Sequence, residues 1–96
     1  MYARITHYQV QRDKLDEALA IGRGIRADVS RIPGLRAFAS FSRDDGKAVV
    51  IAVYENKVAA GAAAQYVTEV WKKLSAVLAG PPIMEEYSNV LACDVM

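Results

Sequence analysis

The most informative stretch of this chain is Ala48-Val49-Val50-Ile51-Ala52-Val53-Tyr54. Its β-branched residues favour a strand over a helix, and Gly46 and Asn56 stand just outside it. Because neighbouring residues of a strand point to opposite faces of a sheet, a continuous apolar run indicates that neither face meets water. The helices of so small a chain can cover only one face. We therefore expect another subunit to cover the second face.

The composition describes a small chain with an apolar excess and almost no net charge. Its 96 residues allow one domain, residues 1–96, and 53% of them are hydrophobic, which again indicates surface buried by association. Twelve Lys and Arg against eleven Asp and Glu give a net charge of +1. This balance gives no electrostatic reason to expect a nucleic acid or a membrane as a partner.

The cysteine content and the amino terminus favour the cytoplasm. Cys93 is the single cysteine, so an internal disulfide is excluded, and residues 1–4 carry no sign of a secretory signal. No apolar stretch approaches the roughly 20 residues that span a bilayer. With one His and one Cys, the chain offers no zinc or iron–sulfur ligand set. We expect no cofactor and no metal site.

Apolar spacing predicts a helix between the first two strands. Over residues 14–32, apolar side chains recur every three or four positions, with Asp13 as the predicted cap. Arg23, Arg26 and Arg31 fall outside this apolar face. Pro33-Gly34 ends the helix.

A second helix is predicted after the apolar strand at residues 48–54. Asn56 is placed to cap it, and Gly80-Pro81-Pro82 ends it. The small side chains of residues 59–64 at its start either leave a cavity over the sheet or let the helix sit close to it. The other strands are predicted at residues 2–10, 35–42 and 84–95, and a hairpin turn at residues 44–47.

The resulting order is β-α-β-β-α-β. Right-handed crossovers place both helices on one face of a four-stranded antiparallel sheet. The predicted fold is therefore an α+β ferredoxin-like sandwich with one uncovered sheet face. The apolar strand at residues 48–54 needs that face covered, so we expect two copies to pack sheet against sheet.

Three short motifs in this order resemble the antibiotic biosynthesis monooxygenase-like domains of the dimeric α/β-barrel superfamily. They are Ile32-Pro33-Gly34-Leu35, Tyr54-Glu55-Asn56 and Gly80-Pro81-Pro82. The second usually reads Trp-Glu-Ser in that family, so Tyr54 and Asn56 are conservative departures. The resemblance covers essentially the whole chain. It implies a homodimer whose sheets form a barrel, with a pocket between sheet and helices in each subunit.

The resemblance also implies a range of activities. Members oxygenate polyaromatic hydroquinones and anthrones without a cofactor, or break down haem, and related barrels are isomerases, decarboxylases or proteins without known chemistry. Haem breakdown is disfavoured, because Lys72 and Lys73 occupy the region that supplies an iron-binding His in those relatives. We expect a homodimer that binds a small apolar or aromatic molecule, as a cofactor-independent monooxygenase of a phenol or hydroquinone. The alternatives are a non-catalytic ligand-binding or structural dimer, or an isomerase or decarboxylase.

His7 is the candidate catalytic base, because it is the one side chain that ordinarily titrates near neutral pH. It shares a strand face with Ala3, Ile5 and Gln9. If that face is turned to the helices, His7 enters the pocket and can deprotonate a phenol. The alternative is a structural histidine, or one that faces the dimer partner.

Tyr54, Tyr66 and Trp71 are the candidate substrate-binding residues. Aromatic rings at the end of a strand and along a helix can stack on a planar substrate, and a tyrosine hydroxyl can orient a phenolate. Core packing is the alternative for all three residues.

Charged residues on the strands form a further set. An inward-pointing arginine could bind a carboxylate or stabilise an enolate, whereas salt bridges at the rim are the more common outcome. The arginines are Arg4, Arg36 and Arg43, and the available partners are Glu55, Glu85, Glu86 and Asp94.

Cys93 is more simply a buried small hydrophobe than a nucleophile.

Overall fold

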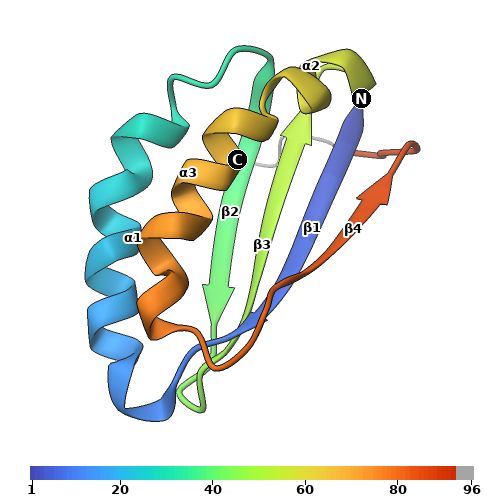
Figure 1. The fold of residues 1–96 in the computed structure, drawn as a ribbon. Coiled ribbons are helices and arrows are strands. Elements are labelled where there is room, and N and C mark those ends of the chain that lie inside the picture. The colour runs from blue at the N-terminus through green and yellow to red at the C-terminus, as the bar shows by residue number, and fades with distance from the viewer. Residues whose placement is uncertain (93–96) are drawn as a thin grey trace.

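The predicted sheet and its topology are confirmed in a computed structural model, which describes residues 1–92 (Figure 1). Neighbouring strands are antiparallel, in the order β2-β3-β1-β4. This is an α+β ferredoxin-like fold, and the apolar strand β3 is one of the two inner strands of the sheet. The strands are β1 (Tyr2–Gln9), β2 (Leu35–Ser42), β3 (Lys47–Tyr54) and β4 (Ile83–Tyr87).

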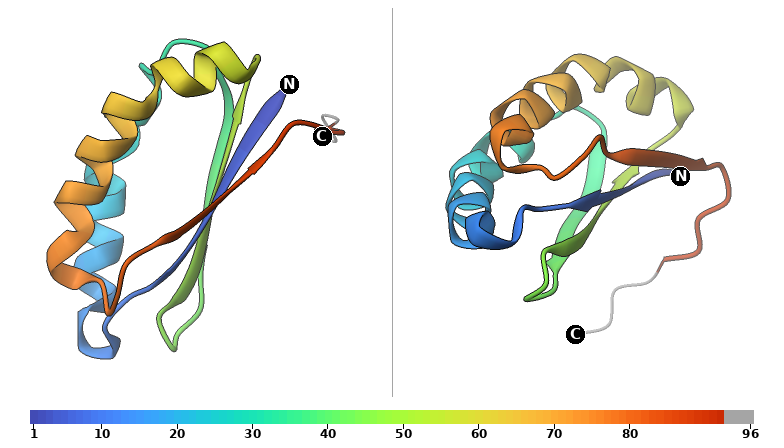
Figure 2. Two further views of the ribbon diagram at one scale, coloured as in Figure 1. Left: turned by 45° about the vertical axis from the view of Figure 1, so that its right-hand side comes forward. Right: turned by 60° about the horizontal axis from the view of Figure 1, so that its bottom comes forward.

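The helices lie on one side of the sheet, and its other side carries no element within residues 1–92 (Figure 2). Helices α1 and α3 run side by side across the sheet. The other helical segments are short. In chain order, the helical segments are η1 (Arg12–Lys14), α1 (Leu15–Val29), α2 (Lys57–Ala62), α3 (Ala64–Leu74) and η2 (Ser75–Val77).

Two helix boundaries differ from their predictions. Asp13 lies inside the η1 turn and α1 begins after Lys14 with no side-chain cap, so the predicted Asp13 cap is wrong. The second helix is divided at Ala63 into α2 and α3. The Asn56 cap is confirmed, because its Oδ1 accepts a hydrogen bond from the Ala59 amide at 2.8 Å.

The last strand is shorter than predicted. β4 ends at Tyr87 instead of continuing through residue 95. The proposals for Cys93 and Asp94 lie outside the described residues.

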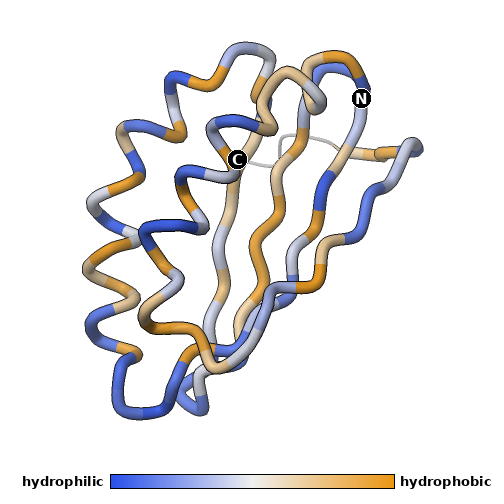
Figure 3. Tube along the Cα trace, in the orientation of Figure 1, coloured by the Kyte–Doolittle hydropathy of each residue, from blue (hydrophilic) through white to orange (hydrophobic). Residues whose placement is uncertain are grey.

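Strand register assigns alternate residues to the two faces of the sheet. In β1, Tyr2, Arg4, Thr6 and Tyr8 face the helices, paired with residues 48–54 of β3. Figure 3 shows β3 hydrophobic along most of its length. We call the opposite side the open face. It is formed by Ala3, Ile5 and His7 of β1, Ala37, Ala39 and Phe41 of β2, Val49, Ile51 and Val53 of β3, and Ile83, Glu85 and Tyr87 of β4.

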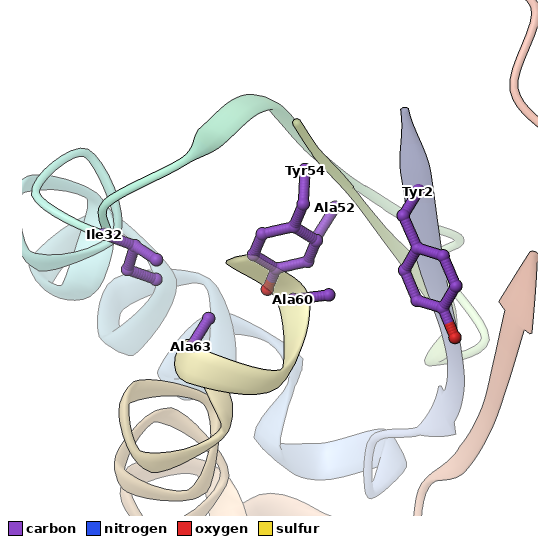
Figure 4. Close-up of a cluster of buried hydrophobic side chains, with 6 residues drawn as sticks. All are labelled: Tyr2, Ile32, Ala52, Tyr54, Ala60 and Ala63. Atoms are coloured by element: carbon purple, nitrogen blue, oxygen red, sulfur yellow. The ribbon is translucent and has the colours of Figure 1, made fainter. Parts of the chain in front are cut away.

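The core has two clusters on the helix side. One joins α2 to the ends of β1 and β3 and contains Tyr54, Ala60 and Ala63, each only 1% exposed (Figure 4). These alanines let α2 approach the sheet closely. The second cluster joins Val10, Ala18, Leu74 and Val77 at the opposite end. The space between the two clusters is the cavity described next.

Candidate functional site

A cavity of about 460 Å³ lies between the sheet and helices α1 and α3. This volume is within the usual range of small-molecule sites. The walls are mainly apolar: α1 contributes Ala18, Ile25 and Val29, and α3 contributes Val67, Val70, Trp71 and Leu74. Strands β1, β2 and β3 form the floor with the side chains of Arg4, Thr6, Tyr8, Phe38, Ser40, Ser42, Val50, Ala52 and Tyr54.

Arg4 and Tyr54 supply polar groups inside this cavity. The Arg4 side chain is only 10% exposed, and its Nη1 donates to the Tyr54 hydroxyl at 3.4 Å. Its Nη2 donates to the Ala60 carbonyl and to Glu86 Oε1, each at 3.2 Å. The guanidinium also lies 5.5 Å from the centre of the Tyr54 ring. Four contacts therefore hold the buried arginine, and two of them are to Tyr54.

The hydroxyl of Tyr54 stays protonated at neutral pH. Burial raises the pKa of this phenol above its ordinary value of 10.0, and the charge of Arg4 offsets part of that rise. Since Arg4 donates to the oxygen, the hydroxyl keeps its own proton for another acceptor. Tyr54 can thus donate a hydrogen bond to an oxygen atom of a bound molecule.

Trp71 adds an aromatic wall. Its ring meets that of Tyr8 edge to face, with centroids 5.1 Å apart and planes at 74°. The Tyr8 hydroxyl and Ser40 Oγ are 3.4 Å apart, so a polar contact continues towards β2. Trp71 therefore offers an aromatic ring against which a planar molecule can pack.

Two of the three predicted substrate-binding residues lie at this cavity. Tyr54 and Trp71 line it, whereas Tyr66 is 45% exposed and lies outside the lining. On α3 the apolar stripe that reaches the sheet side runs through Val67, Val70 and Leu74, and Tyr66 falls beside it.

His7 lies on the open face, across the sheet from the cavity. The face of β1 that meets the helices carries Arg4, Thr6 and Tyr8, so the condition for His7 to enter the pocket is not met. The His7 side chain is 51% exposed, and its Nε2 lies 3.0 Å from Glu85 Oε1. The catalytic role predicted for His7 therefore gains no support from its position within one chain.

The strand arginines find the kinds of partners expected of them. Arg4 pairs with Glu86, and Arg36 pairs with Glu55 at 3.7 Å. Arg43 pairs instead with Asp45 of the hairpin turn, at 3.0 Å. Of these three, only Arg4 lines the cavity.

Two lining residues of α1, Arg23 and Arg26, were not predicted from the sequence. The two arginines stand outside the apolar stripe and suggested a solvated face. The sequence feature that could have indicated a lining role is position, because Arg26 directly follows Ile25 at the edge of the apolar stripe. Gly22 of the predicted apolar face also lines the cavity, and a Cβ added there would meet no atom within 4 Å.

Two further features are absent from residues 1–92. These residues include no group of three or more His, Cys, Asp or Glu able to hold a metal ion. They also include no helix that is long and apolar enough to cross a membrane.

Comparison with known proteins gives matches in structure only. No family model matches the chain, and no curated protein matches it. A candidate antibiotic biosynthesis monooxygenase of Nitrosomonas europaea matches with a TM-score of 0.82 and 20% identity, over 95% of this chain and 100% of that one. The cofactor-independent oxygenase SnoaB of Streptomyces nogalater, as the N63A mutant, matches with a TM-score of 0.75 and 18% identity, over 95% and 94%.

A third structure shows how much this similarity in fold can establish. NE2512 of Nitrosomonas europaea, a protein of unknown function, matches with a TM-score of 0.83 and 11% identity, over 99% of this chain and 93% of that one. Similarity at this level of identity establishes the architecture and leaves the chemistry to the site itself. The chain therefore has the ferredoxin-like fold of the antibiotic biosynthesis monooxygenase domains.

Proposed function

We propose that this protein is a cytoplasmic homodimer that binds a small, largely apolar aromatic molecule in each subunit and oxidises it with molecular oxygen. The substrate class is a phenol or hydroquinone, and no cofactor takes part. The observation that carries the proposal is the apolar cavity with Arg4 and Tyr54 inside it. The likeness in fold to SnoaB, a cofactor-independent oxygenase, agrees with it.

The proposed reaction needs little from the protein. An electron-rich phenol or hydroquinone loses a proton, and the resulting anion gives electrons directly to O2. Oxygen then bonds to a ring carbon. One oxygen atom remains as a quinone carbonyl, and the other leaves as water with two hydrogens from the substrate. The cavity must orient the ring, exclude bulk water and stabilise the anion.

Arg4 and Tyr54 are the groups suited to that stabilisation. A guanidinium charge and a hydroxyl donor in an apolar cavity favour the anionic form of a bound phenol. Among residues 1–92, the cavity lining includes neither a carboxylate nor an imidazole. With the anion stabilised in this way, water can accept the proton.

Oxygen consumption with a panel of hydroquinones tests the proposal. The wild-type chain is expected to exceed the uncatalysed rate, and Tyr54→Phe to lower that excess on the order of a hundredfold, as for loss of a donor to a developing oxyanion. His7→Ala is the comparison variant and is expected to keep the rate, because its imidazole lies across the sheet. A large loss in His7→Ala alone would assign the base to His7 instead.

The second candidate is a ligand-binding protein without catalysis. It is favoured by the lack of an acid–base side chain in the described cavity lining. Tight binding of hydroquinones with no oxygen uptake above background in any variant would support it. Product formed without oxygen would indicate an isomerase or decarboxylase.

A further inference from the structure

The charged residues that line the cavity all have the same sign. They are Arg4, Arg23 and Arg26, and the described lining contains no Asp or Glu. The chain as a whole has a net charge of only +1, so this is a local excess of positive charge. A hollow with low-dielectric walls concentrates such a field and raises the local concentration of anions.

Arg23 and Arg26 stand where the cavity opens. Lining residues that are also exposed mark this opening, and they come from the flank of α1 and from the edge strand β2. Leu19 and Phe38 contribute apolar surface there, each 41% exposed. Ser40 and Ser42 contribute hydroxyls from β2. The opening therefore offers cations and hydroxyl donors beside an apolar interior.

Neither of these two arginines takes part in an ion pair within residues 1–92. The acidic residue nearest to them in sequence on the same helix is Asp28. Its Oδ2 is engaged by Lys73 Nζ of α3 at 3.1 Å. The guanidinium donors of Arg23 and Arg26 thus remain available for an anion from solution.

We propose that the ligand of this cavity is an organic anion, with its apolar body inside and an acidic oxygen group held by Arg23 and Arg26 at the opening. This inference rests on the proposed function, since the ligand occupies the same cavity. It adds a second polar requirement to the phenolic oxygen near Arg4 and Tyr54. The substrate class becomes an aromatic phenol that also carries an acidic substituent.

Two fluorescent probes that differ by a single sulfonate group test this inference. Anilinonaphthalene sulfonate and neutral phenylnaphthylamine share one ring system, and only the first carries a sulfonate. The double variant Arg23→Gln/Arg26→Gln is expected to weaken sulfonate binding about tenfold, because each exposed charge pair contributes modestly. Its affinity for phenylnaphthylamine is expected to stay unchanged. Added salt should weaken sulfonate binding to the wild type.

The matched control is Arg12→Gln/Arg31→Gln, which removes the same charge from positions outside the cavity lining. It is expected to keep the affinity of both probes. Equal loss of sulfonate binding in the two double variants would overturn the inference, because net charge alone would then explain it. Equal binding of both probes to the wild type would also overturn it, while the cavity would still stand as a ligand site. Binding of neither probe would count against the proposed function itself.

Discussion

At the scale of single residues, Arg4 shows how a charge is kept in an apolar interior. Its guanidinium is 10% exposed, yet it donates to a hydroxyl, a carbonyl and a carboxylate. Removing one of these partners would leave a buried donor unsatisfied, which costs about 1–3 kcal/mol or more for a charged group. Arg4 also contacts the hydroxyl and the ring of Tyr54, so it orients the tyrosine within the cavity.

Tyr54 predicts how stability depends on alkaline pH. Burial raises the pKa of its phenol above 10.0 in the folded chain. Below 10.0 both folded and unfolded chains keep this proton; above it the unfolded chain releases the proton first. The folded chain then binds more protons, so the free energy of unfolding falls as pH rises from 10.0 towards the folded-state pKa. Urea unfolding at several alkaline pH values should show a shallower decline in Tyr54→Phe. A decline of unchanged slope would contradict this assignment.

Individual residues also show what the sequence could predict of the site. Tyr54 and Trp71 were predicted from their aromatic character, and both line the cavity. The orientation of His7 could not be derived, because both faces of β1 carry apolar residues and alternation alone cannot orient such a strand. Pairing with β3 and contact with α2 decide it, and both are long-range contacts.

At the scale of elements, the division of the second helix at Ala63 has a tertiary cause. Apolar spacing continues through Ala63, so periodicity predicted one helix. Ala60 and Ala63 are buried against Tyr54, whereas Val67 and Val70 line a cavity. The first part of the helix therefore sits on the sheet and the second stands away from it. The local sequence does not indicate how far each part of the helix lies from the sheet.

Helix α1 offers a paired test of the cavity at Gly22 and Gly24. Neither glycine has an atom within 4 Å of an added Cβ, but only Gly22 lines the cavity. Replacing either by Leu is expected to stabilise the fold by about 0.5–1 kcal/mol, because glycine is a poor helix former. Only Gly22→Leu should weaken phenylnaphthylamine binding, as its side chain extends into the cavity. Urea unfolding and fluorescence titration measure the two effects.

Equal probe affinity in the two leucine variants would contradict this assignment. The probe would then bind elsewhere on the molecule, for example on the open face.

At the scale of the whole molecule, the open face is what the apolar run of β3 predicted. Large apolar side chains are exposed on it, with Phe41 at 53%, Ile83 at 67% and Tyr87 at 43%. Val49, Ile51 and Val53 of β3 lie between them. An apolar surface of this kind is typical of an interface, which agrees with the proposed dimer.

Ile51→Glu tests that dimer by placing a carboxylate in the middle of the open face. We expect the wild type to sediment as a dimer and Ile51→Glu as a monomer, because a buried unpaired charge costs about 3–5 kcal/mol. Val58→Glu is the matched control. It changes an apolar residue that is 81% exposed on α2, and it should remain dimeric. A monomeric wild type would contradict the proposed assembly.

The alternation of side chains between the two faces of the sheet has an evolutionary consequence. Along β1 and β3 every even-numbered residue faces the helices and every odd-numbered residue faces outward, and β2 follows the same rule after its irregularity near Leu35. Under the proposed function, point substitutions within one strand would alter ligand preference and self-association independently. A one-residue shift in the register of the whole of β1 would exchange the two sets, sending Arg4 outward and His7 inward. Such a chain can diverge readily by substitution, whereas insertions are tolerated only in its turns.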